Sequence, residues 1–162
     1  MTSETPWLSA QEEHLWRGWT RLNAELTARL QRAMQADAQL SGSDYEVLVH
    51  LTDSPEGRVR VSDLASLLQW ERSRVSHHLT RMERRGLVER SECVEDGRGA
   101  FIGVSKAGRA AIERAAPGHV AAVRRLVIDA LDAEDVAALS TVFDRMLARL
   151  DEVADTKVAS TA

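Results

Sequence analysis

The residues between positions 72 and 85 include the side chains best suited to contact a nucleic acid. An arginine guanidinium binds phosphate or a guanine edge through paired N–H donors, and serine and histidine reach base edges or nearby phosphates. The candidates for such contacts are Arg72, Ser73, Arg74, Ser76, His77, Arg81, Arg84 and Arg85. We expect Arg74 to pair with guanine, and the arginines at 81, 84 and 85 to contact phosphates.

These side chains need a helix to present them on one face. Val75, Leu79 and Met82 stand at helical intervals and predict the buried stripe of a helix over 72–85. At about 100° of rotation per residue, the side chains directly opposite that stripe are those of Ser73, His77, Thr80 and Arg84. The outer face is therefore polar and cationic.

A shorter helix is predicted directly before this one. Ser62 is placed to cap it, and apolar residues among 64–68 give it a buried side over about seven residues. Residues 69–71 form the turn between the two helices. Two short helices joined by a tight turn are typical of a helix-turn-helix unit that reads duplex DNA.

The residues after Gly86 predict a β-hairpin, or wing. Segments 87–90 and 100–104 have strand patterns, and the turn between them contains Asp-Gly-Arg-Gly at 96–99. Arg98 at the tip of this hairpin suits a narrow, electronegative minor groove. A winged helix-turn-helix DNA-binding domain is therefore predicted over residues 43–105.

Helices are also predicted on the N-terminal side of the turn unit. Segment 8–36 has apolar residues at helical intervals, and Ser9 and Glu12 have the spacing of a capping box. A second helix is expected from about residue 43 to 52, followed by a short β segment over 58–61.

The C-terminal part predicts two more helices. The first begins at Ser105 and runs to about residue 130, and Pro117 followed by Gly118 should kink or break it. The last begins at Asp132, and its apolar residues alternate at three- and four-residue steps, a seam suited to another helix. The residues predicted for dimerisation are Leu15, Val136, Leu139, Phe143, Met146 and Leu150.

The predicted fold class is mainly α with a small β-wing. Segments 8–36 and 106–154 form a helical dimerisation region, since a seam shared by two copies is the economical way to pack helices from opposite ends of a chain. A two-fold dimer also places two recognition helices about one DNA turn apart, which fits a palindromic operator. Segments 1–7 and 155–162 are expected to be flexible tails.

The composition is that of a globular protein whose charge is unevenly distributed. The 162 residues are 44% hydrophobic and 28% charged, and the formal net charge is −4. Between Arg58 and Arg90, however, there are eight arginines and four acidic residues, a local charge of +4 that leaves −8 for the remainder. Such a basic island lets one face bind phosphates while the rest of the chain repels them.

Several other classes of protein are disfavoured. The sequence has no apolar run of 18 residues and no N-terminal secretion signal, so we expect a cytoplasmic protein without membrane contact. The single cysteine, Cys93, excludes an intramolecular disulfide and a zinc site of several thiolates, and the adjacent His77 and His78 diverge on a helix. We expect no metal and no cofactor. An enzyme is disfavoured because a glycine-rich phosphate loop, a nucleophile elbow and evident paired carboxylates are missing.

Other regulatory and binding roles stay open. Oxidation of Cys93 near the wing would disturb DNA contact, although Glu92 and Glu95 disfavour its reactive thiolate. A metal site shared between subunits would make a metal-responsive regulator. A dimeric winged-helix adaptor for protein contact would keep the same fold, but it has no need for the outward arginines. The residues predicted to bind a small aromatic or phenolic effector are Trp16, Trp19 and Arg17.

The order of these elements resembles that of the MarR-type (multiple antibiotic resistance regulator) transcription factors. The resemblance covers about residues 10–152 and is strongest over 61–68, 73–90 and the Asp96-Gly97-Arg98 tripeptide. It implies a homodimer with intertwined N- and C-terminal helices, a recognition helix in the major groove and a wing in the minor groove. Arg98 falls on the family's wing arginine, and Asp96 on the acid that steadies it.

Two positions depart from the family pattern. Glu71 stands where many members have a serine or threonine cap, and Trp70 occupies the place of a small aliphatic residue. We therefore expect a different start of the recognition helix, and an altered turn or an aromatic contact near it. The resemblance as a whole implies a double-stranded DNA-binding regulator, a repressor that binds a palindromic operator and is released by a small effector.

Overall fold

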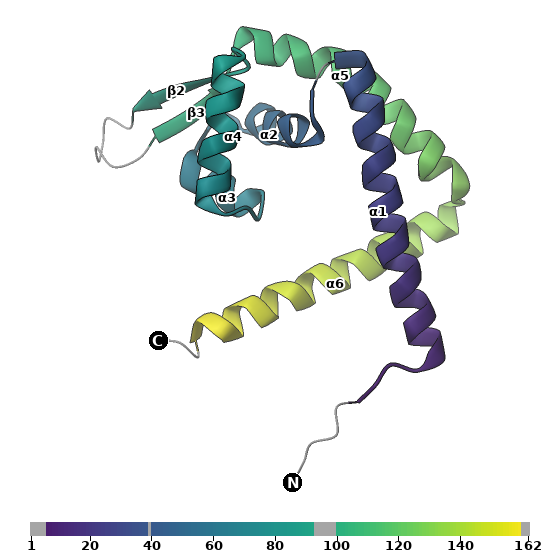
Figure 1. Cartoon of the computed structure of the whole chain (residues 1–162). Coiled ribbons are helices and arrows are strands. Elements are labelled where there is room, and N and C mark those ends of the chain that lie inside the picture. Colours follow the sequence, from purple (N-terminus) through teal and green to yellow (C-terminus); the bar gives the residue numbers. More distant parts are fainter. Residues whose placement is uncertain (1–5, 39, 93–99, 160–162) are drawn as a thin grey trace. The chain divides into compact units, whose positions relative to one another are not determined.

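The computed structural model describes residues 6–38, 40–92 and 100–159, and Figure 1 traces its helices and strands. The chain is mostly helical with one small antiparallel sheet, which confirms the predicted fold class. It divides into two compact units, residues 1–122 and 123–162, which are described separately. Within the described part of the chain, no helix is long and apolar enough to cross a membrane.

Helix α1 (Ala10–Ala38) opens the first unit, and its start is the predicted capping box. The backbone N–H of Ser9 donates to the Glu12 carboxylate over 2.7 Å, and the N–H of Glu12 donates to the Ser9 hydroxyl over 3.3 Å. These reciprocal bonds satisfy donors that a helix start leaves without partners. The N-terminal half of the helix is exposed on every side, and only its last third begins to be buried, at Met34.

Helix α2 (Gly42–Asp53) begins one residue before its predicted start because Ser41 caps it. Strand β1 (Arg58–Arg60) follows and leads directly into helix α3 (Val61–Leu67). The prediction that Ser62 caps α3 is wrong. Arg60 is the last residue with an extended backbone, so Ser62 already lies in the first turn, where its hydroxyl contacts Asp63.

The turn between α3 and helix α4 (Arg72–Arg84) lies where it was predicted. Gln69 has a φ of +52°, and the backbone N–H of Trp70 donates to the carbonyl of Ala65 over 3.0 Å, which closes the turn. The predicted stripe of Val75, Leu79 and Met82 is fully buried in α4. It packs into the core of the first unit, which also contains Leu48, Leu64 and Ile102.

The wing strands are confirmed, and a third strand joins them. Strand β2 (Val88–Glu92) pairs with strand β3 (Ala100–Val104), and β3 also pairs with β1, so the strand order is β1-β3-β2. All pairs are antiparallel. The segment 93–99, with the predicted sites Asp96 and Arg98 and the candidate redox residue Cys93, lies outside the described residues.

Helix α5 (Lys106–Leu126) begins where Ser105 caps it. The Ser105 hydroxyl donates to the carbonyl of Gly86 and accepts the N–H of Gly108, so it ties the start of α5 to the end of α4. A kink or a break was predicted at Pro117, and of these the break is wrong because the helix continues through this residue. A single missing N–H leaves the hydrogen bonds on either side in place.

The close packing of α5 depends on the absence of a side chain at Gly108. A Cβ atom at this position would lie 1.9 Å from the carbonyl oxygen and 2.9 Å from the carbonyl carbon of Leu87. Carbon atoms in ordinary contact lie about 3.5–4.0 Å apart. Gly108 therefore lets α5 approach the backbone at the start of the sheet.

The second unit is formed mainly by helix α6 (Ala133–Ala159), preceded by a short 3-10 helix (Ile128–Ala130). Asp132 caps α6 through reciprocal bonds with Asp135, close to the predicted start. The helix continues to Ala159, past the predicted beginning of the tail at residue 155. Its apolar side chains are exposed in the single chain.

Candidate nucleic-acid interface

The face of α4 opposite the buried stripe is polar and exposed. Ser73, Ser76, His77 and Arg84 all lie on the surface, and Arg72 is exposed in the first turn. Their positions follow from helical geometry, since the core contacts of the stripe fix which side of α4 meets solvent. Five of the eight residues of segment 72–85 predicted to contact DNA are therefore exposed on this helix.

The other three predicted residues lie on a flank of α4 that faces partners within the protein. The guanidinium of Arg74 stacks over the Trp70 ring, 4.0 Å from its centroid, and Arg81 contacts the His78 ring nitrogen Nδ1 over 3.0 Å. Arg85 donates to the carboxylate of Asp44 over 2.7 Å. All three side chains remain partly exposed, so these contacts compete with binding to phosphate.

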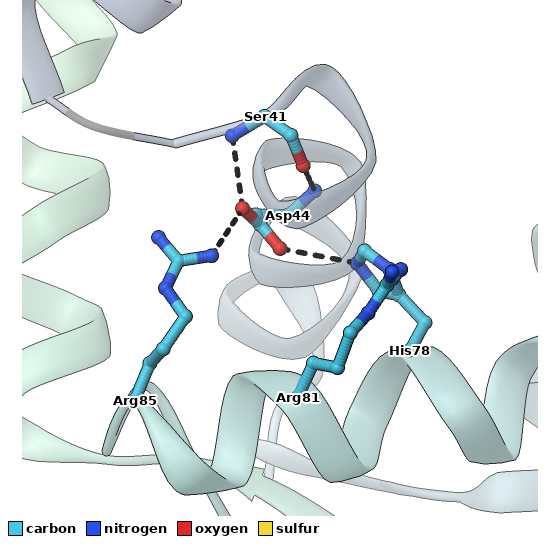
Figure 2. A network of polar contacts seen from close by, with 5 residues as sticks. All are labelled: Ser41, Asp44, His78, Arg81 and Arg85. Carbon is cyan, nitrogen blue, oxygen red and sulfur yellow. Dashed lines mark hydrogen bonds and ion pairs between the residues drawn. The ribbon is translucent and has the colours of Figure 1, made fainter.

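Asp44 is the centre of a polar network that the sequence did not reveal (Figure 2). Its side chain is buried beneath α4, and the residue is only 2% exposed. The Oδ2 atom accepts from Arg85 and from the backbone N–H of Ser41, and the Oδ1 atom lies 3.2 Å from His78 Nε2. The contact with His78 is electrostatic and lacks the alignment of a full hydrogen bond.

The pKa of Asp44 reflects this surrounding. Burial by itself raises the pKa of the carboxyl, but the contacts with His78, Arg85 and Ser41 together outweigh burial and hold the pKa well below its ordinary range. The carboxylate is therefore ionised at every pH at which the protein is expected to be folded. A buried ionised acid with this many donors links α2 firmly to α4.

Replacing Asp44 with asparagine should make the protein less sensitive to acid. Because the carboxyl pKa is lowered in the folded state, its contribution to stability is complete above about pH 4, the ordinary aspartate pKa, and is lost as pH falls further. We expect the free energy of unfolding of wild type to exceed that of the variant by about 2 kcal/mol at pH 7, after discounting for the exposed arginine. Urea unfolding between pH 7 and pH 3 should show this difference shrink below pH 4. A difference that stays constant over the whole range contradicts the assignment.

A cavity of about 430 Å³ lies next to the recognition helix, entirely within the first unit. Residues of α1, α2, α4 and α5 and Trp70 from the turn line it, and Arg74 and Glu46 bring charge to its wall. The ring of His119 lies 4.7 Å from that of Tyr45, and its buried Nδ1 atom has no hydrogen-bond partner among the described residues. The wall therefore offers aromatic faces and a cation.

The residues predicted to bind an effector do not line this cavity. Trp16 and Trp19 are 59% and 41% exposed on α1, and Arg17 pairs with Glu13 on the helix surface. The cavity instead uses Trp70, which the sequence had marked only as a departure from the family pattern. An aromatic contact was expected near the turn, and Trp70 provides it: its ring lies against the Arg74 guanidinium and packs edge-on against His78.

Other basic residues surround the sheet. Arg58 and Arg60 lie on β1 with their guanidinium carbons 4.8 and 5.1 Å from the centroid of the Phe101 ring, and Arg90 on β2 lies 3.9 Å from Glu83. Among the residues that the structure describes, no group of three or more histidine, cysteine, aspartate or glutamate side chains could hold a metal ion.

The residues predicted for dimerisation are exposed in the single chain. Leu150 is 66% exposed, and Leu15 on α1 is 71% exposed. The remaining predicted residues share one side of α6 and are also on the surface, namely Val136, Leu139, Phe143 and Met146. An apolar stripe of this length in water is typical of a surface that another helix covers.

Comparison with known proteins places the chain among transcriptional regulators. A model of the MarR family matches residues 38–99. AbsC, a MarR family transcriptional regulator from Streptomyces coelicolor, is 40% identical, and the match covers 91% of this chain and 99% of that protein with a TM-score of 0.85. No curated protein sequence matches the chain.

Two further matches are structures of complexes with DNA. Sco3205, a MarR family transcriptional regulator from Streptomyces coelicolor in complex with DNA, is 37% identical over 91% of each chain, with a TM-score of 0.85. A mutant of MarR from E. coli complexed with operator DNA is 20% identical over 82% of this chain and 93% of that one, with a TM-score of 0.74. The latter similarity supports the fold alone.

Proposed function

Because the chain belongs to the MarR family of transcriptional regulators, we propose that it is a repressor that binds a palindromic operator as a homodimer and is released by a small molecule. Membership makes it a DNA-binding regulator and not an enzyme. The observation that carries the finer proposal is the exposed polar face of α4, held outward by a fully buried stripe on its opposite side. We propose the cytoplasm as its location because its DNA target lies there.

The proposed contacts divide by their position on α4 and the wing. Ser73, Ser76 and His77 reach base edges in the major groove, and Arg72 and Arg84 contact the phosphates beside them. Arg98 enters the minor groove and Asp96 steadies it, as in the family pattern. The contacts predicted for Arg74, Arg81 and Arg85 require each to leave its partner in the protein, so we assign these three a secondary role in binding DNA.

The proposed dimer joins the apolar stripe of α6 and the exposed N-terminal half of α1 to those of a second copy. Leu15 and the five α6 residues from Val136 to Leu150 supply the apolar surface. Trp16 and Trp19 suit the same layer better than an effector site, since they lie outside the cavity. Burial of these side chains is the main source of affinity between the two copies.

The proposed effector is a small aromatic acid or phenol that enters the cavity beside α4. Trp70 and Tyr45 offer aromatic faces, and Arg74 offers a cation for an acidic group. A molecule held here contacts the first turn of the recognition helix. It can therefore favour an orientation of α4 that no longer fits the groove.

Arg84→Ala should weaken binding to the operator about tenfold, because it removes a phosphate contact without disturbing the core. The test titrates wild type and variant against the DNA directly upstream of the gene, with a scrambled duplex as control, at several salt concentrations. The variant's salt slope should be smaller by about 0.9 for one lost phosphate contact. Arg114→Ala, at an exposed position of α5, is the matched control and should bind as wild type does.

The same titration decides between the regulator and an adaptor. Tight, salt-sensitive binding to a palindrome by two copies of the chain supports the repressor, and aromatic acids such as benzoate can then be tested for release of the DNA. Equal weak binding to both duplexes, repeated with sequences selected from the whole genome, supports a winged-helix adaptor instead.

A further inference from the structure

The recognition helix is attached to α2 at two points by one carboxylate. Asp44 contacts His78 in the second turn of α4 and Arg85 directly after its last residue. Those two residues are seven positions apart, or about 10 Å along a helix. The buried stripe already fixes which side of α4 faces the core. Two polar attachments at this separation add to that restraint, since they resist both a tilt of α4 and a small rotation about its own axis.

Asp44 can serve as a fixed point because its own carboxylate is held in place. It is the third residue of α2, and it forms a capping box in which the Ser41 hydroxyl accepts its N–H over 3.1 Å. The Ser41 N–H in turn donates to Oδ2 over 2.9 Å. The side chain that meets α4 is therefore anchored to the start of α2, and Figure 2 shows it between His78 and Arg85, with Arg81 on the far side of the His78 ring.

The contact from Arg81 also determines which ring nitrogen of His78 accepts a hydrogen bond. Arginine has only donors, so the contact from Arg81 makes Nδ1 of His78 an acceptor, and the proton of the neutral ring must lie on Nε2, which faces Asp44. An asparagine at position 44 cannot meet the same demands. Its single amide oxygen can accept either from His78 or from Arg85 and Ser41. In both cases the NH2 group faces the remaining donor, with which it cannot form a hydrogen bond.

The same carboxylate holds a cation away from DNA. The side chain of Arg85 is 44% exposed, and Arg81 also lies on the surface, so both could reach phosphate if released. Phosphate contacts increase the affinity for DNA of any sequence. Contacts of Ser73, Ser76 and His77 with base edges increase the affinity only for the operator sequence. A change that releases Arg85 and loosens α4 should therefore lower the affinity for the operator and raise the affinity for unrelated DNA.

We infer that Asp44 is a positioning residue for DNA recognition: it sets the orientation of α4 through His78 and Arg85, and it withholds Arg85 from sequence-independent contacts. This inference rests on the proposed function, since it assigns a role in reading the operator. Asp44 itself touches no DNA in this role. Its effect is on the ratio of operator affinity to affinity for unrelated DNA.

The test compares full-length wild type with Asp44→Asn on the operator duplex and on a scrambled duplex at several salt concentrations. We expect the variant to lose operator affinity and to keep or gain affinity for the scrambled duplex, so that the specificity ratio falls at least tenfold. The salt slope on scrambled DNA should become steeper by about 0.9 if Arg85 gains one phosphate. Asp53→Asn removes the same charge from an exposed position of α2 and should leave the ratio unchanged.

Two further measurements separate positioning from loss of stability. Nitrogen NMR of the imidazole should detect the Nε2-protonated ring of His78 in wild type and a change of tautomer or exchange in the variant. Arg85→Gln removes one attachment at a partly exposed side chain and preserves the capping box. It should lower the specificity ratio without steepening the salt slope, so the inference stays testable even if Asp44→Asn fails to fold.

The outcomes are distinguishable. If both variants bind the two duplexes with the wild-type ratio, or lose affinity for both in equal proportion, Asp44 is only structural and the inference is overturned. If wild type itself prefers no sequence from the whole genome, the proposed function fails instead, whatever the variants do.

Discussion

Gly108→Ala is expected to lower the free energy of unfolding by about 3 kcal/mol, a large share of the stability of a small domain. The added Cβ would meet the backbone carbonyl of Leu87 at 1.9 Å, and the Cδ2 atom of Leu48 is already only 3.2 Å away. A backbone carbonyl cannot rotate aside like a side-chain end, so α5 must shift. That shift also strains the hydrogen bonds of Ser105, which connect the start of α5 to Gly86.

Thermal and urea unfolding of the purified protein measure this effect. Both variants are compared with wild type at a protein concentration too low for two copies to associate. Gly18→Ala is the matched control, because it is the same change within a helix, and no described atom outside the neighbouring backbone of that helix lies within 4 Å of the new Cβ. Alanine is favoured over glycine inside a helix by about 1 kcal/mol, so the control should be neutral or slightly stabilising. Equal behaviour of the two variants would mean that α5 does not pack on Leu87 as described.

Charges in the apolar stripe of α6 should produce the second large effect. We expect Phe143→Asp combined with Leu150→Asp to weaken the proposed dimer at least about 1000-fold, because burial of each apolar side chain contributes about 2 kcal/mol and a buried carboxylate opposes association. The winged unit should stay folded, since its core lies wholly within the first unit. Operator binding should fall with the dimer, because one copy reads only half of a palindrome.

Sedimentation equilibrium measures the mass of each variant, and circular dichroism monitors its helices. Thr141→Asp with Ala148→Asp adds the same charge to the opposite side of α6, about 160° from the stripe by helical rotation, and should leave the mass unchanged. If the double variant at positions 143 and 150 remains a dimer, the apolar stripe of α6 is not the dimer interface.

Local patterns predicted the helices well because their cause is local. The three-residue stripe of α4 and the capping box at Ser9 depend only on spacing along one segment, and the structure confirms both. The errors also have local causes. Ser62 is a good capping residue in the wrong place because β1 continues to Arg60, and Pro117 is tolerated because a long helix continues on both sides of it.

The polar network of the candidate site could not be predicted in the same way. Asp44 and Arg85 are 41 positions apart, and their contact exists only because α2 packs against α4. From the sequence, Arg84 and Arg85 are both expected to contact phosphates, and helical rotation separates them only by placing Arg84 directly opposite the buried stripe. Packing turns Arg85 toward a buried acid and leaves Arg84 in solvent, so only the structure separates a positioning contact from a candidate DNA contact.

The strand order β1-β3-β2 has a consequence for self-association. Both outer strands present backbone groups that a strand from another molecule could pair with, and such edges promote aggregation. Here β1 has only three residues and contains two arginines, and β2 places Glu89 and Arg90 at its exposed positions. Short, charged edges resist extension of the sheet, so the first unit is a poor template for β-aggregation.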